Sequence, residues 1–124
     1  MLTNSGNPII EIGRSVLKSA TEGLVHLSTT LDDSFVQATK LITNSSGKIV
    51  FSGIGKSGII AQKLSFTMCS MGTFAHYIHP VDALHGDLGM IENNDIIIII
   101  SHSGATPEII VFLEYSSLKT KLPI

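Results

Sequence analysis

The sequence predicts an α/β fold of three layers, α/β/α, in which helices cover both faces of a doubly wound parallel sheet and two helices precede the sheet. Short apolar runs without polar alternation, such as KIVFS at 48–52 and the isoleucine-rich run 95–101, are typical of strands buried on both faces. Segments with helical spacing of apolar residues alternate with these runs. Such alternation favours parallel strands joined by right-handed crossovers.

Two helices are predicted ahead of the first strand. From Ile9 onward, apolar residues recur every three or four positions, which predicts a long amphipathic helix. Gly13 and Gly23 inside it each cost about 1 kcal/mol in helix propensity. We therefore expect this helix to depend on packing against a larger body or another subunit. Asp32 or Asp33 can cap the second helix, which the sequence Asn-Ser-Ser-Gly ends.

Three strands are predicted in the rest of the chain, with a helix after the first and another after the third. The runs expected to form strands are KIVFS (48–52), FAHYI (74–78) and residues 95–101. The glycine-rich GIGKSG follows the first run and leads into a helix that Gly72 ends. The last helix is expected to begin with Thr106 as its N-cap and Pro107 at its first position. Residues 118–124 are expected to turn and begin a fourth strand.

Composition limits the class of protein. The 124 residues are 44% hydrophobic and 15% charged, which indicates one globular domain. A formal net charge of -2 provides no basic surface for nucleic acid or for a membrane. No apolar run approaches the ~18 residues that span a bilayer, and the N-terminus lacks a signal-peptide pattern. We expect a cytoplasmic protein without nucleic-acid or membrane partners, whose single cysteine, Cys69, is buried and unreactive.

The first candidate binding loop is GIGKSG, residues 53–58. It matches G-x-G-x-x-G between a strand and a helix, but the second predicted strand lacks the acidic end residue of a dinucleotide site. Position 50 is valine, so the spacing of a P-loop is not met either. Gly55 lets the backbone approach a ligand, and Lys56 and Ser57 lie at a helix N-terminus, where an anion is favoured. A tight turn with a solvated lysine is the alternative.

The second candidate loop is SHSGATPE, residues 101–108. Ser101 and Ser103 offer hydroxyl groups, and Gly104 allows the turn. The helix that opens at Thr106 directs N–H groups and its positive end toward the same space. A phosphate would satisfy these groups together, whereas a capping turn without a ligand is the alternative. Because open α/β sheets bind ligands at the carboxyl ends of their strands, we expect both loops to form one phosphate site.

A third segment, HPVDALHGDLG at 79–89, is expected to form a loop over the same rim. His85 lies between Asp82 and Asp87, where it can exchange protons near neutral pH. Metal binding by His79, Asp82, His85 and Asp87 is the alternative, although their spacing matches no specific site. We therefore predict no metal and no other cofactor.

The chain resembles the sugar isomerase (SIS) domain family, and within it the arabinose-5-phosphate isomerases. The resemblance lies in the order and spacing of three segments, GIGKSG, HPVDALHGDLG and SHSGATPE. The match covers residues 8–122, and HGDLG is its most specific part. The resemblance implies a five-stranded parallel sheet and homo-oligomers, dimeric or tetrameric, with active sites at subunit boundaries. It implies that the substrate is a sugar phosphate, with D-arabinose 5-phosphate and D-ribulose 5-phosphate interconverted through an enediolate. That reaction feeds 3-deoxy-D-manno-octulosonate synthesis, which supplies precursors of lipopolysaccharide.

The resemblance also assigns roles to residues. The positions that match phosphate-binding positions are Ser57, Ser101, Ser103 and Thr106, beside Gly55 and Gly104. Those that match catalytic positions are Lys56, His85 and Glu108. Lys56 would neutralise the developing oxyanion, while His85 and Glu108 would divide proton transfer and ring opening. Which of the two takes the carbon-bound proton stays open. Asp82 and His102 depart from the family, which more often has glutamate and asparagine there.

The resemblance further implies that residues 1–124 are one partial SIS domain, with a helical lead-in at 8–46 and the α/β portion at 47–124. The last strands of the family, a further catalytic histidine and the paired CBS modules that commonly follow lie outside this sequence. A sugar-phosphate sensor without catalysis and an inactive remnant are the alternatives. The HGDLG segment favours the enzyme, because a sensor has little use for His85.

Overall fold

The structure, a computed structural model, describes residues 6–119. The chain divides into two compact units, Met1–Ala38 and Thr39–Ile124. The expectation of a fourth strand at 118–124 lies almost wholly outside the described residues. None of the helices described has the length and apolar character needed to cross a membrane.

The first unit contains the predicted amphipathic helix, α1 (Pro8–Thr30), and the start of α2 (Asp33–Asn44). Asn7 caps α1 by accepting a hydrogen bond from the N–H of Ile9 at 3.0 Å. Asp32 is the residue that caps α2, because its Oδ1 accepts the N–H of Ser34 at 2.9 Å. Hydrogen bonds from the hydroxyl and N–H of Ser34 lower the pKa of Asp32. Both predicted helices are confirmed, and neither contains a buried residue.

The second unit contains one sheet of three parallel strands in the order β2-β1-β3. The strands are β1 (Ile49–Ser52), β2 (Ala75–Tyr77) and β3 (Ile96–Ile99). Ile49 of β1 lies opposite Ala75 of β2 and Ile96 of β3. All three predicted strands are confirmed, each one to three residues shorter than expected, because their outer residues belong to the connecting loops.

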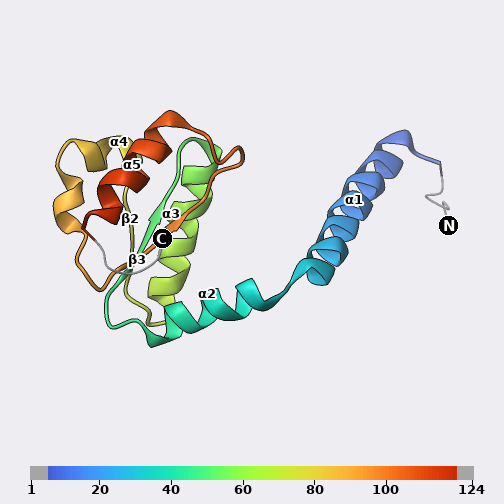
Figure 1. The fold of residues 1–124 in the computed structure, drawn as a ribbon. Helices are drawn as coiled ribbons and strands as arrows, with labels where there is room; N and C mark the ends of the chain where they lie inside the picture. The colour runs from blue at the N-terminus through green and yellow to red at the C-terminus, as the bar shows by residue number, and fades with distance from the viewer. Residues whose placement is uncertain (1–5, 120–124) are drawn as a thin grey trace. The chain divides into compact units, whose positions relative to one another are not determined.

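Helices cover both faces of this sheet, so the three-layer α/β/α class is confirmed (Figure 1). The helices are α3 (Lys56–Ser70) on one face, and α4 (Pro80–Leu84) and α5 (Pro107–Ser117) on the other. Ile49 and Phe51 pack with Ala61 of α3, whereas Val50 between them packs with Ala83 of α4 and Phe112 of α5. All four residues of β1 are buried, as expected of a central strand without polar alternation.

Two expectations were wrong in this unit. The segment 79–89, expected as a loop, contains α4 and the start of a short 3₁₀ helix, η1 (Asp87–Met90). His79 caps α4 by accepting the N–H of Val81 on its Nδ1, and Pro80 occupies the first helical position. Cys69 is exposed rather than buried, and its thiol donates a hydrogen bond to the carbonyl of Ala75 at 3.1 Å.

The starts of β1 and β3 are joined by the carboxylate of Asp95, whose side chain is 1% exposed. Its Oδ1 accepts the N–H of Lys48 at 3.0 Å, and its Oδ2 accepts the N–H of Glu92 at 2.8 Å. The ammonium group of Lys48 forms an ion pair with Oδ2. One buried charge thus satisfies two backbone donors and one ammonium group.

Replacing Asp95 with alanine is expected to lower the free energy of unfolding by about 3 to 5 kcal/mol, because it leaves a partly buried ammonium and two N–H donors without their acceptor. Lys48→Met is also expected to be destabilising, because it leaves the buried carboxylate without its counter-charge, although both backbone hydrogen bonds remain. Urea unfolding at constant m-value measures the change. The control is Glu114→Ala, which removes an exposed carboxylate; a loss in Asp95→Ala no larger than in this control would contradict the assignment.

Candidate functional site

The loops that follow β1 and β3 border one cavity of about 250 Å³ at the carboxyl edge of the sheet. It is lined by Ile54, Ser57, Ile100, Ser101, His102, Ser103, Thr106 and Ile109. The four hydroxyl residues that the sequence assigned to phosphate binding are therefore together around one space. Gly55 and Gly104, assigned with them, belong to the same two loops and do not line the cavity.

The first wall of the cavity is the turn from β1 into α3. Gly55 is the N-cap of α3, and its φ of 60° is a left-handed conformation that favours glycine. Because glycine has no side chain, it leaves the first N–H groups of the helix without a side-chain acceptor. A Cβ on Gly58 would lie 2.6 Å from the carbonyl oxygen of Gly53. Gly58 is thus needed for close packing of the first turn of α3 on the end of β1. This packing places Ser57 at the cavity.

The second wall is the serine loop, 101–106. The hydroxyl oxygen of Ser101 accepts the N–H of Gly104 at 3.0 Å, and that of Ser103 accepts the N–H of Ala105 at 3.2 Å. Because each oxygen accepts a backbone hydrogen bond, each hydroxyl keeps its own hydrogen for a ligand. Thr106 is the N-cap of α5, as predicted, but its side chain makes no capping hydrogen bond. Its hydroxyl is likewise available to a ligand.

The electrostatic character of the cavity follows from these walls. The N-termini of α3 and α5 carry the positive ends of two helix dipoles, and both helices begin at the loops that form the cavity. None of its lining residues is a carboxylate, and Ile54, Ile100 and Ile109 supply its apolar part. Hydroxyl donors, helix N-termini and the absence of acidic lining groups together suit a small anion.

The three predicted catalytic residues lie outside the cavity lining. Lys56 is the first residue of α3, Glu108 is the second residue of α5, and His85 is the C-cap of α4. All three are exposed. Among the described residues, no hydrogen bond or ion pair joins them to one another. Lys56 directly precedes the lining residue Ser57, and Glu108 directly precedes the lining residue Ile109, so the backbone of each lies beside the cavity.

The structure does not support the alternative of a metal site in the segment 79–89. Within residues 6–119, no group of three or more His, Cys, Asp and Glu side chains is gathered closely enough to hold an ion. This includes the four residues considered from the sequence.

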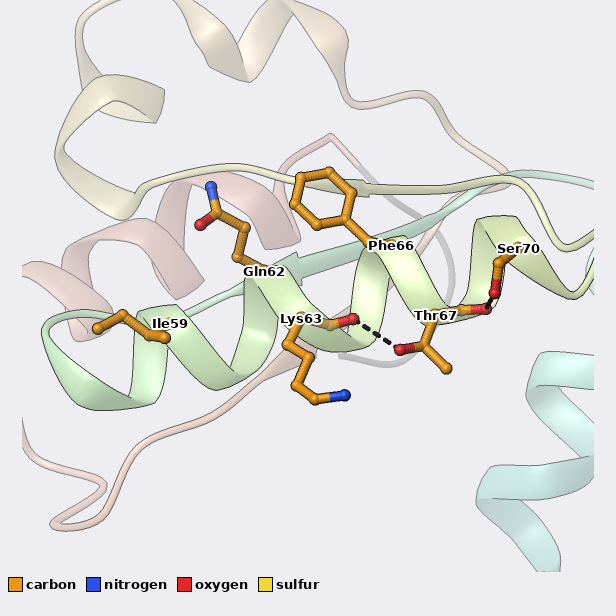
Figure 2. A pocket seen from close by; sticks show the side chains of 6 residues that line it. All are labelled: Ile59, Gln62, Lys63, Phe66, Thr67 and Ser70. Atoms are coloured by element: carbon orange, nitrogen blue, oxygen red, sulfur yellow. Dashed lines mark hydrogen bonds between the residues drawn. The ribbon is translucent and has the colours of Figure 1, made fainter.

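A larger hollow of about 460 Å³ lies along α3 (Figure 2). Its lining residues are Ile59, Gln62, Lys63, Phe66, Thr67 and Ser70, all from this one helix. The hydroxyls of Thr67 and Ser70 donate to backbone carbonyls of their own helix, at 2.9 and 2.7 Å (Figure 2). No loop or helix N-terminus contributes to it. The smaller cavity is therefore the better anion site despite its size.

Two residues near the cavity were not assigned a role from the sequence. His102 lines the cavity, although it was noted only as a departure from the family pattern. Tyr77, at the end of β2, donates its hydroxyl to the carbonyl of Gly53 at 2.9 Å. Tyr77 is partly buried, and the hydroxyl of a tyrosine in such a position usually has a hydrogen-bond partner, but only the fold identifies which one.

Similar proteins place this chain in a family. Arabinose 5-phosphate isomerase GutQ of Escherichia coli O6:H1 is 46% identical over 101 residues, covering 82% of this chain and 32% of the relative. Arabinose 5-phosphate isomerase KdsD of Salmonella typhi is 41% identical over 99 residues, covering 80% of this chain and 30% of the relative. This chain thus spans about a third of the length of the curated relatives it matches.

A solved structure agrees with these relatives. The structure of E. coli CFT073 c3406 in complex with arabinose 5-phosphate has a TM-score of 0.85 and 34% sequence identity to this chain, covering 92% of this chain and 61% of that one. The family model described as the SIS domain matches residues 41–124. That match includes the whole sheet and both walls of the cavity, and on this evidence the chain belongs to the SIS domain family, as its motifs predicted.

Proposed function

We propose that the cavity between the loops after β1 and β3 binds the phosphate group of a sugar phosphate. The observation that carries this proposal is the convergence of four hydroxyl residues and two helix N-termini on one space without a carboxylate in its lining. A phosphate oxygen accepts hydrogen bonds from hydroxyl and N–H groups and is attracted by the positive ends of helices.

We further propose that the sugar phosphate is D-arabinose 5-phosphate and that the protein interconverts it with D-ribulose 5-phosphate. Supporting this choice, the curated relatives at 41% and 46% identity are arabinose 5-phosphate isomerases, and the similar solved structure is a complex with arabinose 5-phosphate. The matched region is about a third of those relatives. The activity of the whole protein, including a place in lipopolysaccharide precursor synthesis, is therefore part of the proposal.

The proposed reaction requires removal of a proton next to a carbonyl, stabilisation of the enediolate and return of the proton to the adjacent carbon. Lys56, a cation at the start of α3, is proposed to stabilise the developing oxyanion. His85 and Glu108 are proposed to divide proton transfer and ring opening. Because Glu108 is the second residue of α5, directly after Pro107, a sugar whose phosphate occupies the cavity can extend toward its carboxylate.

A homo-oligomer, dimeric or tetrameric, is also proposed. The apolar side chains of α1 support it, since Ile9, Leu17 and Leu24 are 77%, 70% and 68% exposed. A helix with such a stripe usually buries it against another surface. Size measurement by light scattering across a range of protein concentrations tests this proposal.

A sugar-phosphate sensor is the second candidate function. It is favoured by the exposure of Lys56, His85 and Glu108 and by their position outside the cavity lining. A sensor needs the phosphate cavity but no proton transfer. The two functions therefore differ in what replacement of His85 does.

Replacement of both Ser101 and Ser103 with alanine is expected to weaken binding of D-arabinose 5-phosphate, because each hydroxyl is proposed to donate a charge-assisted hydrogen bond worth about 1.5 to 3 kcal/mol. This corresponds to a loss of about tenfold to a hundredfold in affinity for each bond, measured by calorimetry. The control is Ser70→Ala with Ser117→Ala, which removes two exposed helical hydroxyls. Equal affinities in the two double variants would refute the phosphate assignment.

His85→Asn is expected to lower turnover by about 10²- to 10⁴-fold, as for loss of a general acid or base, while leaving phosphate binding nearly intact. The assay measures D-ribulose 5-phosphate formed by this chain joined to the part of the Escherichia coli relative that follows the matched region. His26→Asn, which changes an exposed histidine of α1, is the control. Unchanged turnover would remove His85 from the mechanism, and loss of binding together with turnover would make its role structural.

A further inference from the structure

The hydroxyl of Tyr77 contacts the backbone at the start of the turn that forms the first wall of the cavity. Tyr77 is the last residue of β2 and pairs in register with Phe51 of β1. Its hydroxyl donates a hydrogen bond of 2.9 Å to the carbonyl oxygen of Gly53, the residue that follows β1. This bond joins the end of β2 to the turn that leads into α3.

Gly53 is packed against the backbone of both cavity walls. A Cβ added there would lie 2.9 Å from the carbonyl oxygen of Ile100 and 3.0 Å from the carbonyl carbon of Ser57. Both residues line the cavity: Ser57 belongs to the first wall, and Ile100 directly precedes the serine loop that forms the second wall. Gly53 therefore has no free space on the side where a Cβ would project, and a displacement of its peptide in that direction would push against these lining residues.

The side chain of Tyr77 is held in place for this contact. Its ring packs against the buried cluster between the sheet and α3, which includes Phe51 and Ala61. Burial raises the pKa of the Tyr77 hydroxyl above its ordinary value of 10.0, and the negative charge of Asp82 raises it further. The hydroxyl accordingly keeps its proton at neutral pH and remains a hydrogen-bond donor.

We infer that Tyr77 is a positioning residue for the phosphate cavity: by holding the carbonyl of Gly53, its hydroxyl sets the position of the first turn of α3, and with it Ser57, relative to the serine loop. This inference rests on the proposed function of the cavity. Tyr77 does not line the cavity, so it acts through Gly53 rather than by touching a ligand. The packed ring holds the side chain in place, and the hydroxyl makes the contact with Gly53.

The test is Tyr77→Phe, which removes the hydroxyl and keeps the ring. The matched control is Tyr115→Phe, since Tyr115 is the other tyrosine of the chain, is 53% exposed on α5 and lies outside the cavity lining. Affinity for inorganic phosphate is measured by NMR titration. Tyr77→Phe is expected to bind about two- to tenfold more weakly than the wild type, the range of one net hydrogen bond, and the control should bind like the wild type. Equal affinity in both variants would overturn the inference.

A second measurement without ligand separates this inference from the proposed function. The N–H groups of Gly58 and Ile59 donate to the carbonyls of Ile54 and Gly55, at 3.3 and 3.1 Å, and close the first turn of α3. Amide hydrogen exchange at these two positions should accelerate in Tyr77→Phe and not in the control. Acceleration spread evenly over β1 and β3 would instead mean that the hydroxyl only stabilises the fold, and this overturns the inference. If the wild type fails to bind phosphate, the proposed function is wrong. In that case the hydrogen exchange of Gly58 and Ile59 alone decides whether Tyr77 positions the first turn of α3.

Discussion

The alignment of the sheet depends on the carboxylate of Asp95, which among residues 6–119 is the only charged side chain that is fully buried. It accepts the N–H of Lys48 just before β1 and the N–H of Glu92 in the turn before β3, and it pairs with the Lys48 ammonium group. A buried carboxylate is tolerated only when its oxygens are satisfied in this way. The first residues of the two strands are therefore in register, and Ile49 lies opposite Ile96.

The cavity at the opposite edge is a consequence of this alignment. Strands β1 and β3 each have four residues, so their last residues are also in register, with Ser52 opposite Ile99. The N–H of Ile100 donates to the carbonyl of Ser52 at 2.9 Å, and the hydroxyl of Ser52 donates to the carbonyl of Ile78 at 2.7 Å. All three strands are thus tied together where their loops begin. A slip of one residue would turn the side chains of a strand to the other face and separate the two walls.

The glycines and hydroxyl groups at this edge have different tasks. Gly58 is required by packing, since a side chain there would contact the end of β1 and the Tyr77 hydroxyl, 2.9 Å from the added Cβ. Ser101 and Ser103 first hold their own loop, by accepting backbone N–H groups, and still have a hydrogen to donate. A loop that is already formed loses less conformational entropy when a ligand binds. This suits a site whose ligand is small and highly charged.

The family was predicted from the resemblance of three sequence motifs. Local periodicity predicted the three layers and the strands, and the position of loops at the ends of parallel strands predicted the hydroxyl residues around the cavity. The N-cap position of Thr106 was also predicted, since Thr-Pro is a local signal. Only the tertiary structure decided that segment 79–89 contains α4, that Cys69 is exposed, that His102 lines the cavity and that Tyr77 holds Gly53. Tyr77 and Gly53 are 24 residues apart in the sequence, and Lys48 and Asp95 are 47 residues apart. Such contacts, and the directions of the side chains that make them, depend on how helices and strands pack in three dimensions. No local sequence pattern contains that information.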